Sequence, residues 1–254
     1  MISHTDAFKV YRDLGQAHLN FVVLACHAVP ALKVELSAPG GAATIPPDHF
    51  KAGGNTTSQL LSYAADYQEE LARSALITVF SYFEAYVKDA LTEIVDFHGG
   101  ATKLRASARD KVSKYFGAVS ATLDTSRKKL QDRPDPKKRG KYEKHAQTLD
   151  KAGYRFPTDL LAHFGAAQLV LKIGKPGFKA HEIPDLLENV LLFPLSSADR
   201  GTLEAIRAAR NGIAHGKGAK PTLRKVMCYS SELHRIAAAV DGHIAKHFLV
   251  IQAL

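Results

Sequence analysis

Apolar residues recur at steps of three or four along most of the chain, a period that predicts α-helices. The first predicted helix covers residues 5–29, and Pro30 is expected to kink or end it. Its pattern consists of Phe8, Tyr11, Leu14, His18, Phe21 and Leu24. The longest apolar stretch, residues 21–32, is too short to span a bilayer and predicts a buried helix.

The clearest helical pattern covers residues 58–97, and Gly99 and Gly100 are expected to end this helix. One apolar face runs along it, formed by Leu76, Val79, Phe80, Phe83, Val87, Ala90, Leu91 and Ile94. A helix of this length with so continuous a face predicts the central element of a helical core.

Shorter helices are predicted at 102–123, 158–172 and 182–192. Ser196 or Ser197 is suited to cap a helix that runs to about residue 214. The last helix, 222–250, has a narrow apolar seam formed by Leu223, Val226, Ser230, Leu233, Ala237, Val240, Ile244 and Phe248. No convincing strand alternation is found, so we expect an all-α bundle that forms a single domain over residues 1–254.

Residues 126–158 differ in character, because prolines, glycines and charges dominate there. We expect an insertion or protruding segment over 126–180. The formal net charge is +9, and residues 101–150 hold 14 Lys and Arg against 6 Asp and Glu. A local basic excess favours polyanionic partners, although a solvated, solubilising loop would explain it equally well.

The basic residues of this segment are expected to form an exposed, mobile arm that contacts RNA phosphates. They are Lys128, Lys129, Arg133, Lys137, Lys138, Arg139 and Lys141. The interleaved prolines argue against a regular helix here.

Other features exclude several classes of protein. Cys26 and Cys228 stand among apolar neighbours and predict small core residues in a reducing compartment. The first residues lack the pattern of a signal peptide, so a cytoplasmic protein without a membrane partner is expected. No nucleotide-binding loop or zinc spacing occurs, and we expect no metal or other cofactor. His243 and His247 are four residues apart and could bind a metal, but a polar helix edge explains them better.

The most informative stretch is residues 210–215, with the sequence RNGIAH. Arginine holds phosphate oxygens with a planar set of donors, and histidine transfers protons near neutral pH. Asn211 and His215 are four residues apart and share a helix face, whereas Arg210 lies about 140° from His215 on an ideal helix. A helix C-terminus capped by Gly216 would account for the same residues without any chemistry.

Glu84 lies at the margin of the apolar face of the helix at 58–97. An unpaired, partly buried carboxylate is costly, so Arg210 or His215 is expected to approach it. The alternative is a surface carboxylate that pairs with Lys88, four residues later.

The helix segment FEAYVKDAL at 83–91, followed later by RNGIAHG at 210–216, resembles the HEPN superfamily of helical domains. That family has an R-x4–6-H motif, often with a polar residue after the arginine, and an acidic position in an earlier helix. The resemblance implies that Arg210, Asn211, His215 and Glu84 are site residues. It covers mainly residues 70–97 and 196–250.

Many HEPN proteins are metal-independent endoribonucleases of toxin–antitoxin or antiviral systems, and the resemblance implies this activity here. The ribose 2′-OH would attack the adjacent phosphorus, with His215 as base or acid and Arg210 stabilising the developing charge. The alternative is a non-catalytic HEPN-like module that binds a protein partner or a nucleotide. A third possibility, a partner of an antitoxin that modifies a tyrosine near the motif, is disfavoured because the next tyrosine is the distant Tyr229.

A homodimer is also expected, because one Arg–His pair offers only one clear proton-transfer group and a twofold partner would supply another. The seam at 223–248 and the apolar face at 76–94 are candidate packing surfaces. An antitoxin or another defence-operon protein is a further expected partner.

Overall fold

The structure is a computed structural model. It describes residues 3–41, 56–116, 121–131, 135–154, 156, 163–174, 179–216 and 220–250. All regular elements in these ranges are helices, and none of the described residues forms a strand. The expected all-α fold is therefore confirmed.

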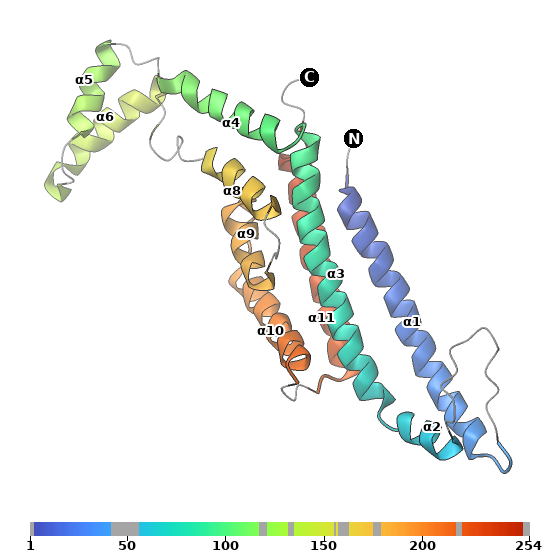
Figure 1. The fold of residues 1–254 in the computed structure, drawn as a ribbon. Coiled ribbons are helices and arrows are strands. Elements are labelled where there is room, and N and C mark those ends of the chain that lie inside the picture. Colours follow the sequence, from blue (N-terminus) through green and yellow to red (C-terminus); the bar gives the residue numbers. More distant parts are fainter. Residues whose placement is uncertain are drawn as a thin grey trace.

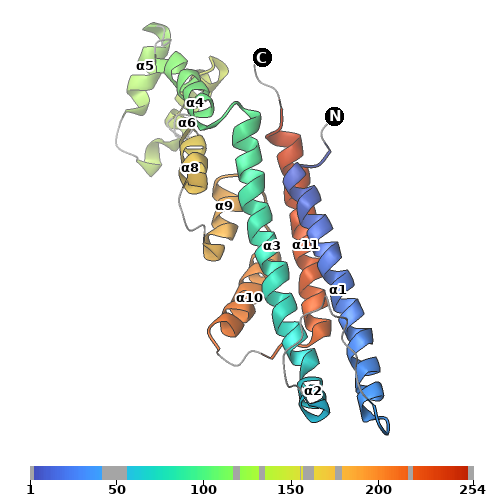
Figure 2. The ribbon, with the colours of Figure 1, turned by 45° about the vertical axis from the view of Figure 1, so that its right-hand side comes forward.

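The centre of the fold is α3, Tyr67–Phe97. It packs against α1, Asp6–Ser37, against α10, Ser197–Ala214, and against α11, Leu223–His247. Figures 1 and 2 show α1 and α10 on opposite sides of α3, with α11 beside it. The apolar face predicted for α3 is buried in full, together with Ala72, Ala75, Tyr86 and Val95.

The single helix expected at 58–97 is wrong, because a turn divides it into α2, Thr57–Tyr63, and α3. Thr56 and Gln59 form a capping box that starts α2. Asp66 then starts α3, with acidic residues in its first turn where they favour a helix N-terminus. The expected stop is confirmed, since Gly99 and Gly100 have φ angles of +80° and +92°.

Two expectations for α1 are wrong, an end at Pro30 and a buried helix at 21–32. The helix continues through Pro30 to Ser37, and Leu36 near its end is buried. The apolar residues also lie on two faces: Phe8 and Tyr11 point into the bundle, whereas Leu14, Phe21 and Leu24 are exposed. By length and composition α1 is apolar enough to cross a membrane, and only 11% of its most apolar window is buried. The stretch 21–32 is thus largely a surface, not a buried helix, because the bundle covers only one side of α1.

The basic segment forms helices, contrary to the expected irregular arm. It contains α5, Ala121–Leu130, the short 3₁₀ helix η1, Pro136–Lys138, and α6, Arg139–Lys151. Pro136 is tolerated because it begins η1, where a backbone N–H has no helical partner to lose. In Figure 1, α5 and α6 pack together at the far end of α4, Ala101–Phe116, away from the bundle. The helix expected at 102–123 ends at Phe116, and residues 117–120 and Arg133 lie outside the described ranges.

The chain returns to the bundle through α8, His163–Gly174, which packs on α4 and α3. The short helices η2, Ala180–Glu182, and α9, Ile183–Asn189, then lead into α10. The hydroxyl of Ser196 accepts a hydrogen bond from the Asp199 amide at 3.0 Å, so the predicted cap of α10 is confirmed. The path from α8 to α10 lines one side of α3 (Figure 1).

The start of α1 is attached to α11 by a buried carboxylate. Asp241 is fully buried and accepts hydrogen bonds from the backbone N–H of Thr5 at 3.2 Å and from its hydroxyl at 2.5 Å. The Nδ1 atom of His4 lies 2.8 Å from the other carboxylate oxygen. Thr5 also caps α1 by accepting from the Phe8 amide, so one cluster fixes both the helix start and its contact with α11.

We predict that Asp241→Ala lowers the free energy of unfolding by about 3 kcal/mol, because two donors of Thr5 lose their acceptor in a buried place. Chemical denaturation of both proteins measures the difference. Asp89→Ala, at an exposed position of α3, is the matched control and should stay within about 0.5 kcal/mol of the wild type. Equal losses in the two variants would contradict this role for Asp241.

Candidate functional site

The RNGIAH stretch forms the C-terminal end of α10. The helix is regular to Ala214, His215 is its C-cap residue, and Gly216 follows with a φ angle of +65°. The amide of His215 donates to the Asn211 carbonyl at 3.0 Å, which completes the last turn. Since only glycine adopts such a φ angle without strain, Gly216 lets the chain turn away directly after His215.

Arg210 points across to α3, where it meets the predicted carboxylate. Its Nη2 atom lies 3.6 Å from Oε2 of Glu84, and its Nη1 atom donates to Oδ1 of Asn211 at 3.1 Å. Both side chains of the ion pair are largely buried, with 28% of Arg210 and 20% of Glu84 exposed. The Nε atom of Arg210 is buried and finds no hydrogen-bond partner among the described residues. This donor is therefore left unsatisfied within the described part of the protein.

The electrostatics of Glu84 show two opposing influences. Burial raises the pKa of the Glu84 carboxyl above its ordinary value, and the positive charge of Arg210 lowers the pKa by a smaller amount. The Glu84 carboxylate is thus held at the margin of the core, where it orients Arg210. The positive charge of Arg210 only partly offsets the cost of burying this carboxylate.

His215 stands apart from this group. Its side chain is exposed, and within the described part of the chain no hydrogen bond, ion pair or ring contact involves its imidazole. His215 lies five positions after Arg210, which corresponds to about 7.5 Å along the helix axis. The structure therefore brings Arg210, Asn211 and Glu84 together and leaves His215 accessible one turn away, at the open end of α10.

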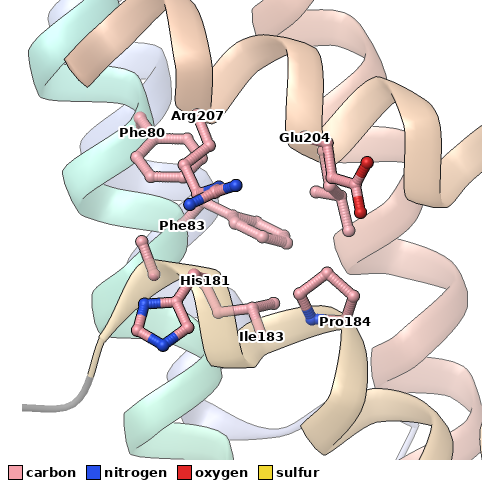
Figure 3. Close-up of a pocket in the computed structure, with 9 residues that line it drawn as sticks. Phe80, Phe83, His181, Ile183, Pro184, Glu204 and Arg207 are labelled. Atoms are coloured by element: carbon pink, nitrogen blue, oxygen red, sulfur yellow. The ribbon is translucent and has the colours of Figure 1, made fainter.

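A small cavity of about 30 Å³ lies beside the motif, between α3, η2, α9 and α10. Its apolar wall includes Phe80 and Phe83, which precede Glu84 on α3. Figure 3 shows Arg207 reaching toward these rings from α10 and the imidazole of His181 on the η2 side.

Sequence reasoning missed both Arg207 and His181. Arg207 is four residues before Asn211 and eight before His215, so the three share one helix face, and this spacing was visible in the sequence. Within the described residues Arg207 forms no ion pair, so its charge is available to a ligand. His181 is brought to the cavity only by the return of the chain through η2, which no local pattern indicates.

The predicted RNA-binding residues lie far from the motif along the chain and in space (Figure 1). Lys128 and Lys129 are exposed on α5, whereas Lys137, Lys138, Arg139 and Lys141 are exposed on η1 and the start of α6. Part of this charge is compensated locally: Lys128 pairs with Asp124 at 2.9 Å and Arg139 with Glu143 at 2.7 Å.

The two surfaces expected to support dimerisation are used within the protomer. Val226, Leu233, Ala237, Val240 and Ile244 of the α11 seam are all buried, as is the apolar face of α3. A twofold partner would need a different surface.

The pair His243 and His247 is an aromatic contact at the end of α11, with ring centroids 4.7 Å apart. His243 Nε2 also lies 2.8 Å from the Leu191 carbonyl oxygen. Among the described residues no group of three or more His, Cys, Asp or Glu side chains is arranged to hold a metal ion.

Comparison with known proteins identifies the family to which this chain belongs. Searches of curated proteins and of solved structures give no match. The family model described as RiboL-PSP-HEPN matches residues 49–246, which is more than half of the chain and includes α2, α3, α10 and nearly all of α11. The helical architecture agrees with this match, and the chain therefore belongs to the RiboL-PSP-HEPN family.

Proposed function

We propose that the protein is an endoribonuclease that cleaves RNA by transphosphorylation without a metal ion and acts in a toxin–antitoxin or antiviral system. The observation that carries the proposal is the end of α10: a partly buried arginine, oriented by Glu84, lies one turn from an accessible histidine. This combination suits a phosphodiester, which needs charge stabilisation and proton transfer at neighbouring points.

In the proposed reaction His215 removes the proton of a ribose 2′-OH, and the oxygen attacks the adjacent phosphorus. The P–O5′ bond breaks, which gives a 2′,3′-cyclic phosphate and a 5′-OH after the leaving oxygen is protonated. Arg210 stabilises the negative charge that grows on the phosphoryl oxygens through the part of its guanidinium that is exposed. Asn211 and Glu84 position Arg210.

Arg207 and His181 extend this site toward the neighbouring nucleotide. Arg207 lies on the same face of α10 as Asn211 and His215, where it would bind a flanking phosphate. His181 lines the same cavity as Arg207 and is a candidate for the second proton-transfer group.

The alternative, a non-catalytic module that binds a protein partner or a nucleotide, is favoured by the separation of His215 from Arg210. The two functions differ in a simple way. A binding module would retain RNA or nucleotide without breaking a bond, whereas a ribonuclease would produce cyclic phosphate ends.

We predict that His215→Ala slows RNA cleavage in the presence of EDTA by about 10²- to 10⁴-fold, the usual effect of losing a proton-transfer group. Arg210→Ala should slow it by about 10²- to 10³-fold, as for the loss of an oxyanion donor. Total RNA and a fluorescent oligonucleotide serve as substrates, and end-group analysis identifies the cyclic phosphate. His181→Ala should lower the rate in the same assay if His181 takes part in proton transfer.

His247→Ala is the matched control, because His247 is exposed on the last turn of α11, at the other end of the bundle (Figure 1). Cleavage by His215→Ala at the wild-type rate, or the absence of any cleavage by the wild type, would refute the proposed chemistry.

We predict that neutralising Lys137, Lys138, Arg139 and Lys141 weakens RNA binding and flattens its salt dependence. Four lost phosphate contacts would lower the log–log slope by up to about 3 to 4. Binding titrations at several salt concentrations measure the slope, and cleavage of bound RNA should continue. The control removes four exposed charges elsewhere, at Lys9, Arg12, Lys88 and Lys246. Equal slopes for the two quadruple variants would show that η1 and the start of α6 do not form an RNA-binding surface.

The raised pKa of Glu84 gives a pH prediction. The folded protein binds the Glu84 proton more tightly than the unfolded chain, so this stabilisation is present below the ordinary pKa of 4.5 and is lost as pH rises through the folded-state pKa. The Tm difference between wild type and Glu84→Gln should therefore move in favour of the glutamine variant as pH rises over this window. Glu35→Gln, at an exposed position of α1, is the control for losing one carboxylate. A difference that moves in favour of the wild type would show that attraction to Arg210 outweighs burial.

A further inference from the structure

The outer face of α1 is an exposed apolar surface that the proposed site does not use. Its apolar residues follow alternating steps of four and three, the spacing of a helix–helix seam. We name as the α1 stripe Val10, Leu14, Ala17, Phe21, Leu24, Ala28 and Ala31, all of which are exposed. The residues that α1 buries in its own bundle, Phe8, Tyr11, Val22 and Leu36, belong to a different face.

The stripe exposes four large apolar side chains on one face of the helix. Val10, Phe21 and Leu24 are 55%, 58% and 64% exposed, and Leu14 is 43% exposed. Together the four large apolar side chains of the stripe present roughly 400 Å², the size of the largest apolar patch on a typical monomer, which is often functional.

The stripe is complementary to an antiparallel copy of itself. If two α1 helices cross between Val22 and Val23, Phe21 of each lies against Leu24 of the other, and Ala17 lies against Ala28. The same register sets Leu14 opposite Ala31, so large side chains meet at the centre, alanines meet on either side of it, and each Leu14 meets a small residue. Residues 14–32 contain no Asp, Glu, Lys or Arg, so the centre of the pair buries no charge. Asp13 lies on the same face but falls near the end of the paired region. At the ends Lys9 approaches Glu35 of the other copy, whereas a parallel pair would bring like charges together.

A lipid bilayer fits the same face less well. A spanning α1 would have to give up the buried Tyr11 and the hydrogen bonds between Thr5 and Asp241. Helices that lie on membranes usually carry a cationic polar face. The charged residues of α1 are Asp6, Lys9, Arg12, Asp13, Lys33 and Glu35, three of each sign.

From these observations we propose that the protein forms a homodimer through antiparallel pairing of the α1 stripe with that of a second copy. Since α1 and α10 lie on opposite sides of α3 (Figures 1 and 2), this dimer directs the two R-x4-H motifs outward. It is thus a different dimer from one in which the motifs face each other, and its test does not depend on ribonuclease activity.

Light scattering of the purified full-length chain tests the proposal. The wild type should be a dimer at micromolar concentration. Leu24→Glu should weaken dimerisation at least about 100-fold, because each dimer would bury two unpaired carboxylates. Its circular dichroism and Tm should match the wild type, since Leu24 is exposed in the protomer. Leu171→Glu, at a leucine of α8 that is 58% exposed, is the matched control and should remain dimeric.

Cross-linking tests the register. With Cys26→Ala and Cys228→Ser as background, Ala17→Cys with Ala28→Cys should give a disulfide-linked dimer on oxidation. Either cysteine alone should not, because equivalent positions lie about 16 Å apart in the antiparallel pair. A monomeric wild type, a Leu24→Glu variant that stays dimeric, or cross-linking of the single variants would each overturn the proposal. Flotation of a monomeric wild type with lipid vesicles would instead identify the stripe as a bilayer-binding face.

Discussion

Burial of α3 is the constraint on which the rest of the structure depends. Most of the surface of this helix is buried, since twelve of its residues are almost inaccessible to water and α1, α10 and α11 all pack against it. Full burial of one such side chain stabilises a fold by about 1.5–3 kcal/mol, so α3 determines where its neighbours can lie. Glu84 is the exception on this helix. It lies at the edge of the buried face, where a carboxylate keeps partial contact with water and a cation from α10 can reach it.

The site follows from how α10 ends. Inside the helix Arg210 has a fixed direction toward α3, and its guanidinium is held by Glu84 and Asn211. Beyond Ala214 the helical geometry stops, because Gly216 adopts a positive φ angle, and His215 is left on the rim. A rigid, partly desolvated cation and a freely accessible imidazole thus arise from adjacent turns. The first suits charge stabilisation, since its geometry is set in advance, and the second suits proton transfer to a ligand that arrives from solvent.

The sequence predicted the local features of this arrangement well and the distant ones poorly. The cap at Ser196, the stop at Gly99 and Gly100 and the apolar face of α3 depend on neighbouring residues, and the structure confirms all three. The approach of Glu84 to Arg210 was expected because a carboxylate at a core margin needs a partner. His181 was missed because only the path through η2 brings it to α10. The helices of residues 121–151 were missed because their prolines were taken to exclude regular structure, although Pro136 occupies a helix start.

Helix α1 shows a different limit of pattern reading. The apolar period predicts a helix but does not indicate which face of the helix packs against the core. In α1, Phe8 and Tyr11 face inward, whereas Leu14 and Phe21 face water. The family match begins at residue 49 and so leaves out α1, whereas α3, α10 and nearly all of α11 lie within it. The Asp241 cluster nevertheless attaches the start of α1 firmly to α11. An element outside the matched region therefore covers one side of the shared bundle and presents a second apolar face, on the side of α3 opposite the motif. Changes in that outer face can alter association without disturbing Glu84 or Arg210, because α3 separates the two surfaces.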